Sequence, residues 1–229
     1  MTLKNQSPTE ENENSQPSGQ TVSPADRVIS FIDGFNLYRG MRDSHLRDCY
    51  WLDVVKLSGL LSPAGTTLVE ATYFTARISG RYDADKQRRQ STYLDALATL
   101  TSLRIVEGTY RTEPVRCSRC HFNWQVPREK QTDVSIATEM LLAATLDRCD
   151  TLLLISGDSD LVPPIRAIHL HFPRKRVIVG FPPNRYSHEL KQVANGFFHV
   201  GPSHLRHSQL PDPVTTAGGF ALRCPAKWA

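Results

Sequence analysis

Four aspartates stand at the ends of apolar runs or at the start of an amphipathic stretch, and together they could bind a metal ion for a hydrolytic reaction. Asp33 ends a short apolar run, Asp158 and Asp160 follow a second one, and Asp133 begins an amphipathic stretch between the two runs. Carboxylates gathered in one place repel one another unless a cation neutralises their charge. Oxygen ligands of this kind suit Mg²⁺ or Mn²⁺ better than Zn²⁺. The chemistry that such a set would support is attack of a metal-activated water on a phosphodiester bond.

Each aspartate also has a simpler explanation. An Asp that follows a strand is commonly a helix N-cap, which would account for Asp133 or Asp160 alone. Asp33 followed by Gly34 is also a common turn. A single aspartate is therefore weak support for a metal site, whereas four at strand and helix ends that should converge are considerably stronger.

The elements that must bring these residues together alternate between strands and helices. Apolar or β-branched runs predict strands, and apolar residues at helical spacing predict helices. The predicted strands are residues 28–32, 68–78, 103–110, 151–155, 176–180 and 197–200, and the predicted helices are residues 51–61, 83–100, 132–146, 161–170 and 186–194. This alternation predicts an α/β fold: a three-layer αβα sandwich with a mostly parallel central sheet. In such sheets ligands bind beyond the carboxyl ends of the strands.

Three segments carry a more specific pattern. They are residues 31–38 (FIDGFNLY), residues 129–134 (EKQTDV) and residues 155–161 (ISGDSDL). In order and spacing they resemble the signature of the NYN domain, a PIN-like family, and most of all its bacterial single-domain members once grouped as a domain of unknown function, DUF88. The resemblance implies a PIN-like fold and metal-dependent ribonuclease activity.

The resemblance also implies roles for particular residues. The acidic catalytic and metal-binding set would be Asp33, Asp133, Asp158 and Asp160. Asn36 would orient a water or a phosphate, Lys130 would direct a point charge at substrate phosphate, and Ser156 would contribute a hydroxyl. One departure is Gln131, where we expect glycine. The side chain of Gln131 could restrict close approach to the backbone at this position, but the substitution removes no carboxylate from the acidic set.

Residues 111–128 are predicted to form an inserted hairpin that contains Cys117 and Cys120. A CxxC motif supplies half of a structural zinc site. The remaining ligands could come from His121, from Cys49 and Cys149, or from a second chain. A reduced, exposed hairpin without Zn²⁺ is the simpler interpretation.

The same hairpin carries cations beside aromatic rings, among them Arg119 and Trp124. Such a surface suits stacking with unpaired bases. The alternative is that Trp124 only packs the hairpin against the body of the protein.

Length, composition and charge restrict the class of protein. The chain has 229 residues, of which 40% are hydrophobic, and a net charge of +4. It can therefore form one domain with a core, and its charge permits a polyanionic partner without requiring one. No apolar run spans a membrane, the N-terminus has no apolar stretch typical of a secretory signal, and the odd cysteine count fits a reducing compartment. We expect a cytoplasmic protein with no membrane partner.

We therefore predict a disordered tail at 1–25, an NYN/PIN-like domain at 26–202 and a C-terminal extension at 203–229 that packs on the core. The predicted function is a metal-dependent ribonuclease that acts on single-stranded or structured RNA. The alternative is an RNA-binding regulatory module with this fold and little or no cleavage activity. A haloacid-dehalogenase-type phosphatase fits less well, because Phe35 stands where its second aspartate would be. PIN-like domains often pair, so a homodimer is also open.

Overall fold

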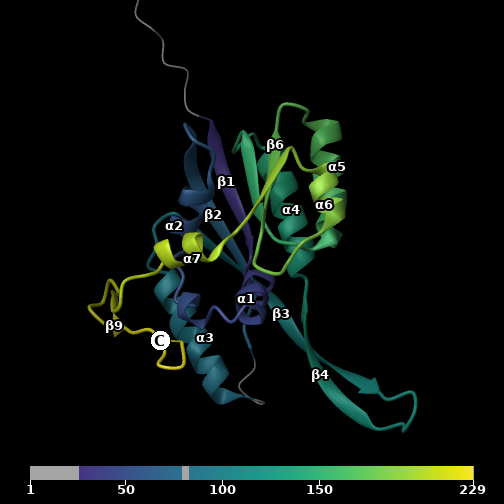
Figure 1. Cartoon of the computed structure of the whole chain (residues 1–229), viewed down its shortest axis with the longest axis vertical. Coiled ribbons are helices and arrows are strands. Elements are labelled where there is room, and N and C mark those ends of the chain that lie inside the picture. The colour runs from purple at the N-terminus through teal and green to yellow at the C-terminus, as the bar shows by residue number, and fades with distance from the viewer. Residues whose placement is uncertain (1–25, 79–82, 229) are drawn as a thin grey trace, which may run out of the picture.

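The computed structural model describes residues 26–78 and 83–228 and is built on a seven-stranded sheet (Figure 1). The strand order is β4-β3-β2-β1-β5-β6-β7. Every neighbouring pair is parallel except β3 and β4. The strands are β1 Arg27–Asp33, β2 Thr67–Ala76, β3 Leu103–Arg116, β4 Asn123–Lys130, β5 Thr151–Ile155, β6 Arg176–Phe181 and β7 Gly196–His199. The predicted α/β sandwich with a mostly parallel sheet is confirmed.

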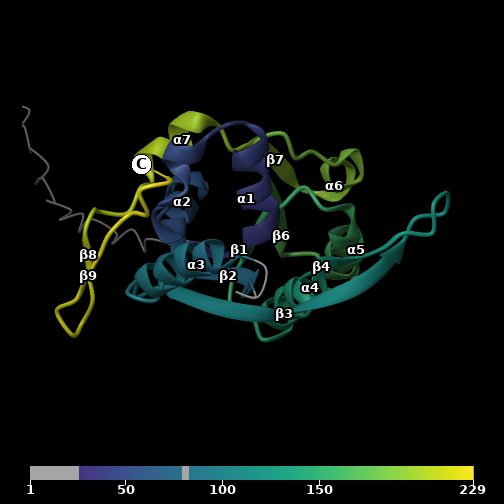
Figure 2. The same ribbon diagram turned by 90° about the horizontal axis from the view of Figure 1, so that it is seen from below.

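Helices cover both faces of the sheet (Figure 2). Residues of the first face share one hydrophobic cluster, and those of the second face share another. On the first face lie α1 Gly34–Asp43, α2 Val54–Leu61, α3 Ala84–Leu97 and α7 Pro202–His207; on the second lie α4 Thr132–Thr145, α5 Val162–His171 and α6 His188–Val193. Two short 3₁₀ turns, Arg47–Cys49 and Ser159–Leu161, connect these elements.

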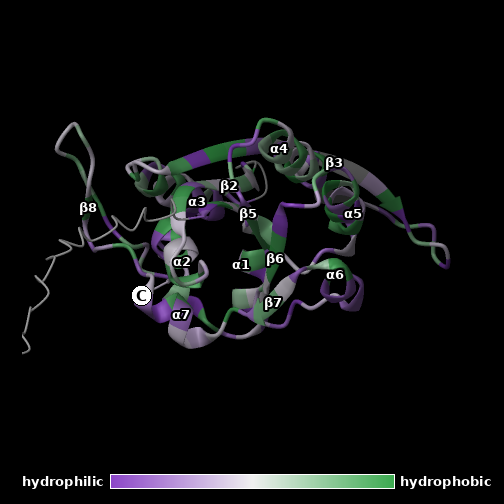
Figure 3. Cartoon of the chain, turned by 90° about the horizontal axis from the view of Figure 1, so that it is seen from above, coloured by the Kyte–Doolittle hydropathy of each residue, from purple (hydrophilic) through white to green (hydrophobic). Residues whose placement is uncertain are grey.

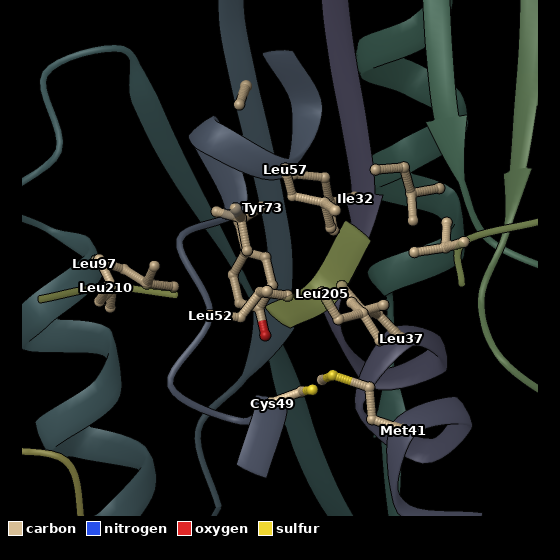
Figure 4. Close-up of a cluster of buried hydrophobic side chains, with 14 of the residues drawn as sticks. Ile32, Leu37, Met41, Cys49, Leu52, Leu57, Tyr73, Leu97, Leu205 and Leu210 are labelled. Atoms are coloured by element: carbon tan, nitrogen blue, oxygen red, sulfur yellow. The ribbon is translucent and has the colours of Figure 1, made fainter. Parts of the chain in front are cut away.

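The core explains why the central strands are so apolar. All five residues of β5 are buried, since helices cover both of its faces. A strand buried on both sides is hydrophobic at every position instead of at alternate ones. Figure 4 shows the first cluster, where Leu37 and Met41 of α1 pack near Tyr73 of β2 and Leu205 of α7.

The structure corrects three local expectations. Helix α1 was not predicted, because its first residues look like an Asp-Gly turn; the Asp33 side chain instead accepts a hydrogen bond from Asn36 N and caps the helix. Helix α2 begins at Val54, behind the cap residue Asp53, and not at residue 51. Strand β3 continues to Arg116 and is not limited to 103–110.

The extra length of β3 forms an arm with β4 that projects from the body (Figures 1 and 2). The antiparallel register runs from Thr109 opposite Lys130 to Arg116 opposite Asn123. Seven residue steps at the usual rise of a strand make the paired part of the arm about 24 Å long. The turn at its tip is mostly hydrophilic in Figure 3. The predicted inserted hairpin is therefore an extension of the central sheet.

The segment after α7 returns to the body of the protein. Leu210 is buried in the first hydrophobic cluster, and Trp51 Nε1 donates a hydrogen bond of 2.9 Å to the carbonyl of Pro211. A two-stranded ribbon follows, formed by β8 Val214–Thr215 and β9 Ala221–Leu222. The tail expected at 1–25 lies outside the described residues. None of the helices in the described part is long and apolar enough to cross a membrane.

Candidate metal centre

Three of the four aspartates meet at one edge of the sheet. Asp33 ends β1, Asp158 lies three residues beyond β5, and Asp133 is in the first turn of α4. One carboxylate oxygen from each lies within 4.8 Å of the other two. They meet because β1 and β5 are adjacent and parallel, so that both carboxyl ends open on the same edge.

Ser156 fixes two of these carboxylates. Its hydroxyl donates to Asp33 Oδ2 over 2.9 Å and accepts a hydrogen bond from the backbone N–H of Asp158 over 3.1 Å. The side chain is fully buried. Ser156 therefore positions Asp33 and the loop that carries Asp158, and its expected contact with substrate stays a prediction.

Asn36 also holds this loop. Its side-chain oxygen accepts a hydrogen bond of 3.1 Å from the backbone N–H of Gly157. A side chain at Gly157 would lie about 2.9 Å from the backbone of Arg185, a distance at which atoms collide. The Ser-Gly pair before Asp158 was the signal of a tightly packed loop, and sequence reasoning assigned the serine to substrate instead.

Asp160 stands apart from the three-carboxylate group. It is exposed, and its backbone N–H donates to Asp158 Oδ1 over 3.0 Å, so Asp158 caps the 3₁₀ turn that contains it. Asp160 nevertheless acts on the group through its charge. Among described residues, the structure thus brings Asp33, Asp133 and Asp158 together as ligands and leaves Asp160 at the margin.

The electrostatics of the centre favour a cation. The pKa of Asp133 is raised, first by partial desolvation of its carboxylate and then by the negative charges of Asp158 and Asp160. A raised pKa means that the ionised carboxylate is held at an energetic cost, which a bound cation would relieve. Three converging carboxylates, one of them buried, fit a hard divalent ion such as Mg²⁺ or Mn²⁺.

Gln131, where the sequence led us to expect glycine, stands at the start of the helix that carries Asp133. Gln131 is the N-cap of α4 and has a φ of 75°. Only glycine adopts this left-handed conformation without steric cost, which is why the family pattern favours glycine here. Lys130, which precedes it at the end of β4, is exposed and close in sequence to Asp133.

Arg119 and Trp124 lie at the far end of the arm. The Trp124 and Phe122 rings stack at 6.3 Å with an interplanar angle of 16°, and their side chains are 42% and 66% exposed. The printed ring contact of Trp124 is with Phe122 of the same arm, and its expected contact with bases stays a prediction. About 24 Å of paired strand lies between the tip of the arm and its base.

The two arm cysteines form a tight turn. Cys117 N–H donates to the Phe122 carbonyl over 2.9 Å, and His121 N–H donates to the Cys117 carbonyl over 3.0 Å. Backbone N–H groups of Cys120 and Arg119 hydrogen-bond the Cys117 sulfur and lower its pKa. Cys49 and Cys149 are buried in the core and cannot complete a zinc site. A zinc ion at Cys117 and Cys120 stays a proposal that needs ligands from elsewhere.

Comparisons with known proteins agree with this geometry. The sequence profile of the NYN domain matches residues 27–201. A search of curated proteins found no match. The crystal structure of a protein of unknown function from Vibrio parahaemolyticus RIMD 2210633 is similar, with a TM-score of 0.51 and 19% identity over 77% of this chain and 94% of that one. At this identity the similarity concerns the fold alone.

Proposed function

Because the chain belongs to the NYN domain family, whose members have the PIN-like fold, we propose that it is a nuclease that uses Mg²⁺ or Mn²⁺ to hydrolyse RNA. The observation that carries the proposal is the convergence of Asp33, Asp133 and Asp158 within 4.8 Å. Three separate segments supply these side chains, which simple helix capping does not require. We also propose that the protein acts in the cytoplasm, since all five cysteines are free.

In this proposal Asp33, Asp133 and Asp158 hold the metal ion. When bound, the ion would lower the pKa of a water molecule and offset negative charge on the phosphate. Asp33 is kept in place by the Ser156 hydroxyl and by Asn36 N–H, so its two oxygens are oriented before the substrate arrives. Lys130, exposed beside the rim, would attract the RNA backbone as a point charge.

Arg119 and Trp124 have a different part in the proposal. The exposed stack of Trp124 on Phe122 would bind unpaired bases some distance from the cleavage site. The arm would then increase affinity for longer RNA strands without contacting the scissile bond. Pairing of two chains into a homodimer stays a prediction.

The test is RNA cleavage by purified protein with EDTA, Mg²⁺ or Mn²⁺, compared with Asp158→Asn. Asparagine retains the oxygen that caps the following turn, so the fold should persist while a metal-binding charge is lost. We expect cleavage that requires metal and falls at least about a hundredfold in the variant, typical of losing a transition-state charge interaction. Asp26→Asn, an exposed substitution before β1, is the matched control.

The outcomes separate the two functions. Undiminished activity of Asp158→Asn, free of host nuclease, would refute the proposed centre. Absence of cleavage with every metal, together with RNA binding that weakens as salt increases, would favour the alternative of an RNA-binding regulatory module.

A further inference from the structure

A cavity of about 130 Å³ opens on the face of the sheet that α1 and α3 cover, near the carboxyl ends of the strands. Gly34 and Phe35, the two residues that follow Asp33, form part of its wall, and Thr75 and Ala76 at the end of β2 form another part. The cavity and Asp33 therefore share the same carboxyl edge of the sheet.

The walls of the cavity are aromatic. Tyr38 and Tyr50 are 5.1 Å apart between ring centroids, and Trp228 contacts the edges of Tyr50 at 5.7 Å and of Tyr93 at 6.0 Å. These rings come from α1, the loop before α2, α3 and the C-terminal segment, and the Trp228 side chain is half-buried. Rings in these orientations accept another flat ring by stacking or edge contacts.

The size of the cavity suits one ring system. At about 30 Å³ for each water molecule in the liquid, its 130 Å³ correspond to about four waters, a volume of the order of one small ring system. A bulky helix or loop of a partner protein would not enter a space of this size. A single flat group on a flexible chain would.

The charged residues of the wall are positive. Among the residues that the structure describes, Lys86 and Arg89 of α3 line the cavity and no acidic residue does. None of the ion pairs found among the described residues uses Lys86 or Arg89. Aromatic rings flanked by cations, next to a cluster of carboxylates, match a base with its attached phosphate rather than a cationic or purely apolar ligand.

We propose that this cavity binds one unpaired nucleobase of the RNA, adjacent to the phosphate at the metal centre, with Lys86 and Arg89 on the neighbouring phosphate. The inference rests on the proposed nuclease function and adds the substrate class: RNA that is single-stranded at the nucleotide next to the cut. A base in a duplex is stacked and paired and cannot enter.

The C-terminal Trp228 gives a direct signal of occupancy. Its indole is part of the wall, so a bound base should change its fluorescence. The probe is adenosine 5′-monophosphate, added to the full chain in EDTA, with ribose 5-phosphate as the control that has a phosphate but no base. Trp124, whose proposed stacking on bases would also respond, is replaced by Phe in both proteins compared. In that background we expect saturable quenching by the nucleotide only, and loss of that quenching in Trp228→Phe.

Two variants on one helix test the cations. Arg89 lines the cavity, whereas its neighbour Arg88 points to solvent and pairs with Asp85 at 3.6 Å. In EDTA, Arg89→Ala should bind single-stranded RNA more weakly, with the slope of log affinity against log salt reduced by about 0.7. Arg88→Ala should leave both unchanged, and neither substitution removes a core side chain.

The results distinguish this inference from the nuclease proposal, because no binding experiment requires cleavage. Equal responses to the nucleotide and to ribose 5-phosphate, or equal losses in Arg88→Ala and Arg89→Ala, would overturn the cavity assignment even if the protein cleaves RNA. Nucleotide quenching in a protein that cleaves nothing would support the base-binding cavity while the nuclease proposal fails.

Discussion

Substitution of Asp133 by Asn should stabilise the protein without metal and destabilise it, relative to wild type, when metal is present. Two unit charges 4.8 Å apart repel by about 1 kcal/mol in a water-like dielectric and by about 3.5 kcal/mol at an effective dielectric constant of 20. Asp133 is exposed, so the lower value applies. Asp133 also lies in the first turn of α4, where its charge gains about 0.3–1 kcal/mol from the helix dipole.

Charge repulsion and the desolvation of the Asp133 carboxylate both destabilise the ionised folded state. Together they exceed the favourable interaction of this charge with the helix dipole. We expect Asp133→Asn to gain about 1 kcal/mol in EDTA, which raises Tm by about 2–4 °C for a domain of this size. Bound metal stabilises the folded wild type by about 1.4 kcal/mol at ten times its Kd. The variant lacks one ligand charge and should gain less, so the order of the two melting temperatures reverses.

The pH dependence gives an independent check of the cause. The pKa of Asp133 is raised, so between the ordinary Asp pKa and the raised one the folded state binds more protons than the unfolded chain. The contribution of Asp133 to wild-type stability in EDTA therefore falls as pH rises through this window, and the difference between wild type and Asp133→Asn isolates it from the other carboxylates. The advantage of Asp133→Asn should be small near pH 4 and full at pH 7.

The assay is thermal and urea unfolding at both pH values, with EDTA or Mn²⁺, and with Asp26→Asn as the charge-matched control. A variant less stable than wild type in EDTA would refute the repulsion argument. An equal metal-induced shift in wild type and variant would show that Asp133 is not a ligand.

Two further substitutions test local features. Gln131→Gly should stabilise the protein by about 0.5–1 kcal/mol in urea unfolding, because relief of the left-handed strain exceeds the entropy cost of glycine; Gln131→Ala keeps the strain and should bring no gain, and an equal effect of both would contradict this account. Trp124→Ala should weaken binding of a long single-stranded RNA at least about fivefold, the loss of one base stack, and leave Tm unchanged because the ring is exposed. Unchanged affinity would remove the arm from RNA binding.

The local pattern of residues was enough to predict the sheet and most helices. The five apolar residues of β5 and the spacing in residues 132–146 are properties of consecutive residues, and the structure matches both. The Asp-Gly after β1 was ambiguous, since the same two residues begin a turn or a helix. Only the hydrogen bond from Asn36 N to Asp33 decided for the helix.

For the candidate site, too, some features follow from the sequence and others only from the tertiary structure. The sequence by itself determined which carboxylates stand at strand and helix ends, and hence that Asp33, Asp133, Asp158 and Asp160 could share an edge. Tertiary structure alone decided that Asp160 lies outside the group, that the buried Ser156 hydroxyl bonds Asp33, and that Trp228 lines the same cavity as Gly34, the residue after Asp33. The reason is physical: strand ends follow from local apolar runs, whereas distances between side chains far apart in sequence depend on how the helices pack on the sheet.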